Sequence, residues 1–191
     1  MARTDHPLRG ADGTATASRE AVAVQQSEFG GVKWGAAFFG WLSATGLAVL
    51  LLALVSAADV TLGLTEGASA GEVGLGGAVA LLVVLFLSHL AGGYVAGRMA
   101  RFTGMRQGLA VWLVGLVVVL LVSGAAALLG SEYNVLARLQ LPRIPVGEGT
   151  ATTAGLVTLA AAAAASLVGA LLGGGLGTRY HRRVDRAGFG A

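Results

Sequence analysis

The sequence predicts an all-α membrane protein, a bundle of four transmembrane helices, and three observations lead to this fold class. Apolar residues (AVILMFWYC) make up 55% of the 191 residues, charged residues make up only 12%, and the mean hydropathy is +0.75. Soluble domains typically carry about 25% charged residues. The charged residues also leave four long stretches that contain none of them. This combination argues against a soluble domain and against a disordered chain, which lacks apolar mass.

Each charge-free stretch is long enough to cross a membrane as a helix. About 20 residues at ~1.5 Å rise per residue span a hydrocarbon core of ~30 Å. Backbone polar groups in hydrocarbon must be paired within the segment, and these stretches do not alternate polar and apolar residues as barrel strands do. The predicted spans are 24, 21, 23 and 25 residues long and cover about 34–57, 77–97, 107–129 and 153–177.

The remaining segments are assigned from their composition. Residues 1–30 are polar and have no apolar helical stripe, so we expect a disordered tail before a transmembrane domain at 31–179, and residues 180–191 form a basic tail. The glycine-rich, acidic connection at 58–76 is expected to be flexible. In the third connection, the apolar residues of 132–141 share one helical face, which predicts a short surface helix.

The orientation follows from the distribution of lysine and arginine. Eleven of these 13 residues lie in the N-terminal segment, the second connection and the C-terminal tail, and two lie in the third connection. The positive-inside rule therefore predicts that both termini lie in the cytoplasm. Because these residues flank helix ends, we expect them to contact lipid headgroups rather than nucleic acid. The residues expected to set topology are Lys33, Arg98, Arg101, Arg106, Arg179, Arg182 and Arg183.

Sixteen of the 31 glycines lie within the predicted spans. Small residues let two membrane helices approach closely, and four-residue spacing places them on one face. A hinge or a pore lining is the alternative use. The glycines predicted to pack helices together are Gly169, Gly173, Gly177, Gly93, Gly97 and Gly40.

The chain also shows a weak internal repeat. Residues 33–39 and 106–112 share the order basic, any, glycine, any, alanine, apolar, aromatic, and Gly93-x-x-x-Gly97 matches Gly173-x-x-x-Gly177. One interpretation is a duplicated helical hairpin whose parallel copies are related by an axis along the membrane normal. The other is coincidence in a sequence of low complexity.

His89 is the only ionisable residue in the four predicted spans and lies near mid-membrane. Such residues often mark functional sites. Ser43 and Thr45 fall at a similar depth, and Ser166 lies somewhat deeper, so the four could form a buried polar site. The alternative is a neutral histidine with a purely structural hydrogen bond. Trp41 and Trp112 are expected to pack against neighbouring helices.

The sequence offers no pattern typical of an enzyme. It contains no cysteine, no nucleophile–base pair and no cluster with metal-ligand spacing. We therefore expect no catalytic residue, no cofactor and no metal. The favoured function is structural or partner-binding, through glycine-rich helix packing with a membrane-protein partner or a second copy. The alternative is a small transporter or channel subunit with a polar site around His89.

The chain resembles a family of small, uncharacterised, glycine-rich bacterial membrane proteins with four helices. The resemblance rests on residues 29–35 (FGGVKWG), 92–101 (GGYVAGRMAR) and 107–112 (QGLAVW), and it covers about residues 29–185. It implies an inner-membrane location and no established activity, so no site residue is transferred from it.

Overall fold

The structure of the chain is a computed structural model in which four long helices account for most of the described residues. The described residues are 20, 21, 23–25, 27, 28, 30–63, 66, 67, 69–100, 102–133 and 153–189.

The four helices are α2 (Trp34–Leu62), α3 (Ala70–Met99), α4 (Gly104–Tyr133) and α6 (Thr153–Phe189). Each contains a window that is long and apolar enough to cross a membrane, and the four windows overlap the four predicted spans. The all-α four-helix fold is therefore confirmed, and the chain is a multi-pass membrane protein.

The helices extend beyond the charge-free stretches that predicted them. The connection at 58–76, expected to be flexible, is helical from Ala70 onward and up to Leu62. Charged residues mark where the apolar core ends but do not end a helix. α2 instead ends where Gly63 adopts a left-handed conformation (φ 59°) and its N–H donates to the Asp59 carbonyl at 2.9 Å.

The terminal segments also contain more helix than expected. α6 continues through most of the segment predicted as a basic tail and ends at Phe189. The described positions among residues 20–28 have helical backbone, although disorder was expected there. The surface helix predicted at 132–141 lies outside the described residues, apart from the last two residues of α4.

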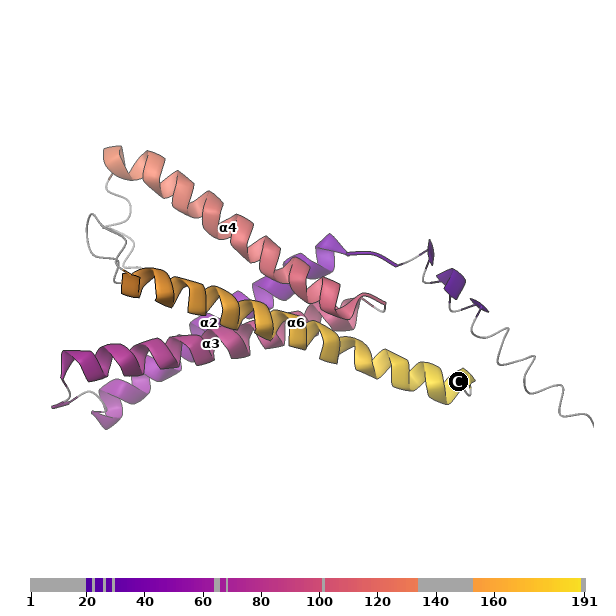
Figure 1. Cartoon of the computed structure of the whole chain (residues 1–191), viewed down its shortest axis with the longest axis horizontal. Coiled ribbons are helices and arrows are strands. Elements are labelled where there is room, and N and C mark those ends of the chain that lie inside the picture. Colours follow the sequence, from indigo (N-terminus) through magenta and orange to yellow (C-terminus); the bar gives the residue numbers. More distant parts are fainter. Residues whose placement is uncertain are drawn as a thin grey trace, which may run out of the picture.

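Figure 1 shows α6 between α4 and α3, with α2 behind α3. The most extensive interface joins α3 and α6, and α2 packs chiefly on α3 while α4 packs chiefly on α6. The starts of α2 and α4, the end of α3 and the part of α6 around Gly177 come together at one end of the bundle, which we call the basic end because Lys33, Arg98, Arg106 and Arg179 lie there. Toward the far end α4 diverges from α3 and α6 (Figure 1).

Glycines hold α3 and α6 in backbone contact. A Cβ atom added at Gly93 would overlap the carbonyl of Ala170, and one added at Gly173 would overlap the carbonyl of Leu90. Gly173 is 80 residues after Gly93, and Ala170 is 80 residues after Leu90. The two contacts are therefore reciprocal, as in a parallel pair of helices related by a two-fold axis.

The next turn toward the basic end repeats this reciprocity. Gly97 faces the backbone of Gly174, and a Cβ at Gly177 would lie 2.6 Å from the carbonyl oxygen of Tyr94. The α3–α6 pair thus has the contacts that a parallel repeat of this sequence predicts.

The contacts of α2 and α4 do not follow this two-fold relation. Gly92 of α3 is buried against Gly40 and Ala44 of α2. Its counterpart on α6, 80 residues later, is Leu172, which is 48% exposed and so is not covered by α4 in the same way. The two-fold relation is confined to the α3–α6 pair.

Packing is concentrated in the half of the bundle nearest the basic end. The buried apolar residues there are small, and Ala37, Ala96, Ala110 and Val111 form one cluster. In the other half, Val119–Ala125 of α4 are exposed at every position. Seven consecutive residues cover two full turns, so no described part of the chain packs on this segment from any side.

We predict that Gly173→Leu destabilises the bundle, because its side chain would have to displace the backbone of α3 at Leu90 and Tyr94. Overpacking of this kind costs about 3 kcal/mol. Thermal unfolding in detergent measures the effect. Gly46→Leu is the matched control, since nothing lies within 4 Å of a Cβ added at Gly46. Equal melting temperatures for the two variants would show that the contact is not needed.

Candidate functional site

Three helices meet at the carbonyl group of Ala170. A Cβ added at Gly93 of α3 or at Gly108 of α4 would overlap this same carbonyl oxygen of α6. Gly93, Gly108 and Ala170 therefore lie at one level of the bundle, where three backbones are in direct contact. We call these three residues the contact layer.

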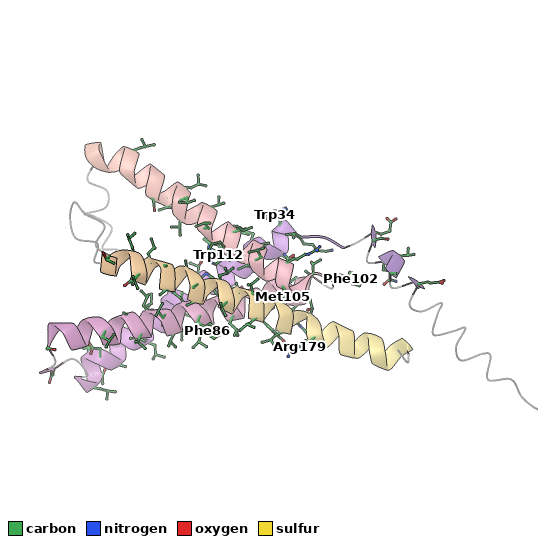
Figure 2. All side chains as sticks on the ribbon, in the orientation of Figure 1. Trp34, Phe86, Phe102, Met105, Trp112 and Arg179 are labelled. Carbon is green, nitrogen blue, oxygen red and sulfur yellow. The ribbon has the colours of Figure 1, made fainter. Side chains whose placement is uncertain are left out.

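The next turn toward the far end carries polar groups from the same three helices. Because residues four apart lie one above the other on a helix, His89 on α3, Trp112 on α4 and Ser166 on α6 each lie one turn from the contact layer. The indole Nε1–H of Trp112 donates to the hydroxyl oxygen of Ser166 at 3.1 Å. Figure 2 shows Trp112 in the region where α4 meets α6. We call His89, Trp112 and Ser166 the polar layer.

The hydrogen bond of His89 fixes the tautomer of its ring. Nδ1 lies 2.9 Å from the carbonyl oxygen of Leu85, one turn away on the same helix. A carbonyl oxygen can only accept, so Nδ1 carries the proton and Nε2 of the neutral ring is left as an acceptor. Within the part of the chain that is described, no group donates to Nε2.

The other members of the predicted polar site are placed differently. The Ser166 hydroxyl is buried and donates to the carbonyl of Ala163 at 3.0 Å. Ser43 is half-buried and donates to the carbonyl of Phe39 at 2.9 Å, within its own helix, and Thr45 is exposed. The structure thus brings Ser166 to the level of His89, but Thr45 lies on the outer surface of α2.

The sequence predicted that the hydroxyls of Ser43 and Thr45 share a polar site with His89, but in the structure the polar group that joins His89 and Ser166 at this level is Trp112. The expectation that Trp41 and Trp112 pack against neighbouring helices is confirmed, since Trp41 packs against the buried cluster and contacts the position of Gly115. The polar role of Trp112 was missed because an indole in a membrane span was interpreted only by its apolar area.

All six glycines predicted to pack helices do so. Gly169 faces the backbone of Phe86 and Leu90, and Gly40 faces Gly92 and Ala96. The predicted set was incomplete, however. Gly104 and Gly108 of α4, which are also four residues apart, and Gly174 of α6 make equally close backbone contacts.

A second polar site at the basic end was not predicted. Gln107 is fully buried, and its carboxamide pairs with the backbone of Lys33. The Lys33 N–H donates to Oε1 at 3.0 Å, and Nε2 donates to the Lys33 carbonyl at 2.6 Å. The Thr103 hydroxyl adds a bond to the carbonyl of Gly31 at 3.0 Å. We call the Gln107–Lys33 pairing the amide clamp.

The amide clamp joins the start of α2 to the start of α4. Because Lys33 precedes the first hydrogen-bonded turn of α2, its N–H has no partner within the helix, and Gln107 supplies one. The sequence did contain a signal, which is a lone amide at the first position of a charge-free stretch. This signal was missed because the spans were defined by the positions of charged residues alone, and Gln107 carries no charge.

The basic residues predicted to set topology are only partly described. Lys33, Arg98, Arg106 and Arg179 lie at the basic end, at or near helix ends. Arg101 lies outside the described residues, and positions 182 and 183 fall in the final turns of α6. Figure 2 shows Arg179 on the part of α6 that continues toward its C-terminal end.

Among the described residues, no group of three His, Asp or Glu side chains could hold a metal ion. The chemistry that the polar layer does offer is hydrogen bonding, through one unprotonated imidazole nitrogen and one serine–indole pair.

Comparison with known proteins adds no functional assignment. No protein-family model, curated protein or solved structure matches the chain. The candidate sites therefore rest on the geometry of the chain itself.

We predict that Gln107→Leu exposes the Lys33 amide to solvent exchange and lowers stability. The Lys33 carbonyl keeps a partner in the Ala37 N–H at 3.0 Å, whereas the Lys33 N–H loses the only partner that the described structure gives it. Loss of a hydrogen bond whose donor becomes open to water costs about 0.5–1.5 kcal/mol. Hydrogen–deuterium exchange of peptides that contain Lys33 measures the loss.

Thr103→Val is the control for this prediction, because it removes the neighbouring bond to Gly31 but leaves the amide clamp in place. Exchange at Lys33 should remain close to wild type in that variant. Slow exchange at Lys33 in Gln107→Leu would mean that the clamp does not hold the start of α2.

Proposed function

We propose that the chain is a non-enzymatic membrane protein that binds another membrane-embedded helix through the far half of α4. The observation that supports this proposal is the uncovered Val119–Ala125 segment. It contrasts with the first half of the same helix, where Gln107, Ala110 and Val111 are almost completely buried.

A glycine of α4 that makes no close helix contact lies in the same half of the bundle. Gly108 is in backbone contact with α6, whereas nothing lies within 4 Å of a Cβ added at Gly124. Small residues in membrane helices serve close helix approach, and Ser123, Gly124 and Ala125 form a run of three such residues on the exposed segment. A partner helix would use this run as α6 uses Gly108.

The packed half supports a structural role. Backbone contacts at the contact layer and the amide clamp connect all four helices at one end. Packed interiors deform little. The packed half would therefore act as a rigid base from which the far half of α4 projects.

We further propose that the basic end faces the cytoplasm of a bacterial cell. The positive-inside rule supports this orientation, and the resemblance to small bacterial inner-membrane proteins supports the location. Lipid headgroups would then contact Lys33, Arg106 and Arg179 at the membrane surface.

A photo-crosslinking amino acid at Leu121 tests partner binding. Leu121 is 67% exposed on the uncovered segment, so in native membranes it should give a discrete adduct with another protein or with a second copy. Mass spectrometry of the adduct identifies which of these it is. The matched control is Leu109, which is 39% exposed on the packed half of the same helix and should give no adduct.

Adducts of equal yield at both positions would indicate random contact, and no adduct at Leu121 would contradict the proposal.

Single cysteines test the orientation without background, because the chain contains no cysteine. Val60→Cys lies near the far end of α2 and is 86% exposed, so a membrane-impermeant thiol reagent should label it from outside intact spheroplasts. Ser27→Cys precedes α2 at the basic end and should be labelled only after the membrane is opened. The reverse pattern would show that the basic end faces outward.

A further inference from the structure

Beyond partner binding, we propose that His89 is the anchor of a binding site that opens toward the far end and takes a ligand with a hydrogen-bond-donating head, such as a primary ammonium group, on an apolar body. Three features of the molecule support this site: the direction of the helix face that carries His89, the Nε2 atom without a hydrogen-bond donor, and the divergence of α4 from the bundle.

The face of α3 that carries His89 lies between two helix contacts. Gly92 meets α2, and Gly93 meets α6. At 3.6 residues per turn, His89 lies about 60° from Gly92 and about 40° from Gly93 around the helix axis, in the arc between them. His89 therefore lies on the side of α3 that faces the other helices, rather than on the side that faces lipid.

Nε2 of His89 needs a donor that the described helices do not supply. Nδ1–H is used by the Leu85 carbonyl, and Trp112 and Ser166 bond to each other. An acceptor without a partner costs free energy in an apolar medium, so a bound group that donates a hydrogen bond would be stabilised there. The hydrogen-bonded pair of Trp112 and Ser166 shows that the polar layer accommodates polar groups.

A ligand would reach His89 from the far end of the bundle. Toward the basic end, the three backbones of the contact layer are in direct contact and leave no space for a ligand. Toward the far end, Leu116–Ala125 of α4 are exposed at every position except Val118, and His89 itself is only half-buried. The exposed apolar side chains of α4 there, such as Leu116 and Val117, suit a hydrocarbon body, while Nε2 suits a donating head.

The test uses His89→Cys in the naturally cysteine-free chain, with a membrane-impermeant trimethylammonium thiosulfonate as the probe. The matched control is Leu87→Cys, which is at nearly the same depth of α3 but on the opposite face of the helix, where Leu87 is 44% exposed. A thiol needs water to ionise and react, so labelling of His89→Cys should be at least about tenfold faster than labelling of Leu87→Cys.

Val60→Cys shows which side of the membrane corresponds to the far end, and the reagent is added from that side. Equal, slow labelling of His89→Cys and Leu87→Cys, or labelling of His89→Cys only from the basic side, would overturn the proposal. Neither outcome depends on a protein partner, so this test and the crosslinking at Leu121 can fail independently.

Wild-type protein gives a second measurement that does not depend on a variant folding. Diethylpyrocarbonate modifies unprotonated imidazole nitrogens, and peptide mass spectrometry separates His89 from His6 and His181. Dodecylammonium, which can donate to Nε2 but also consumes some reagent, should slow modification of His89 relative to His6 and His181, whereas dodecyltrimethylammonium, which has the same charge and tail but no N–H, should not. Equal protection by both, protection by neither, or no modification of His89 would overturn the assignment.

Discussion

Close approach of glycine to a backbone carbonyl is the interaction on which this bundle depends. In a membrane, apolar side chains gain little by leaving lipid for protein, so helix association relies on close van der Waals contact. The carbonyl of Ala170 receives two such contacts, from Gly93 and Gly108. This shared contact sets the depth at which α3, α4 and α6 cross, and it thereby places His89, Trp112 and Ser166 together one turn away.

The same constraint explains why the two halves of the bundle differ. Glycines and alanines line every interface near the basic end, and buried polar groups there are paired, as Gln107 is with Lys33. Larger side chains occupy the start of the exposed part of α4, at Val119–Val122, and backbones separated by them cannot meet, while the small residues that follow, Ser123–Ala125, have no described helix against them. The packed half therefore follows from the small residues at the helix interfaces near the basic end.

The sequence predicted the features that depend only on the positions of residues along the chain. The number and position of the spans follow from where charge is absent, and the rows of Gly169, Gly173 and Gly177 follow from a four-residue period. Features that depend on how helices are rotated toward each other were less accessible. Thr45 shares the depth of His89 but lies on the exposed side of α2, and the place of Trp112 is set by its contact with Ser166. The helix at 70–76 was missed because glycine was interpreted as a loop signal, although its backbone can remain helical in a long apolar segment.

The pairing of α3 with α6 also has a consequence for the order in which the protein assembles. Membrane helices insert individually and then associate. α3 enters the membrane before α4 and α6 are made, and the residues that contact Gly93 and Gly97 arrive about 80 positions later. The central interface can therefore close only after the last helix has inserted. Until then the glycine face of α3 is open to lipid, to the insertion machinery or to a chaperone, so synthesis of α6 is the step that commits the chain to its native structure.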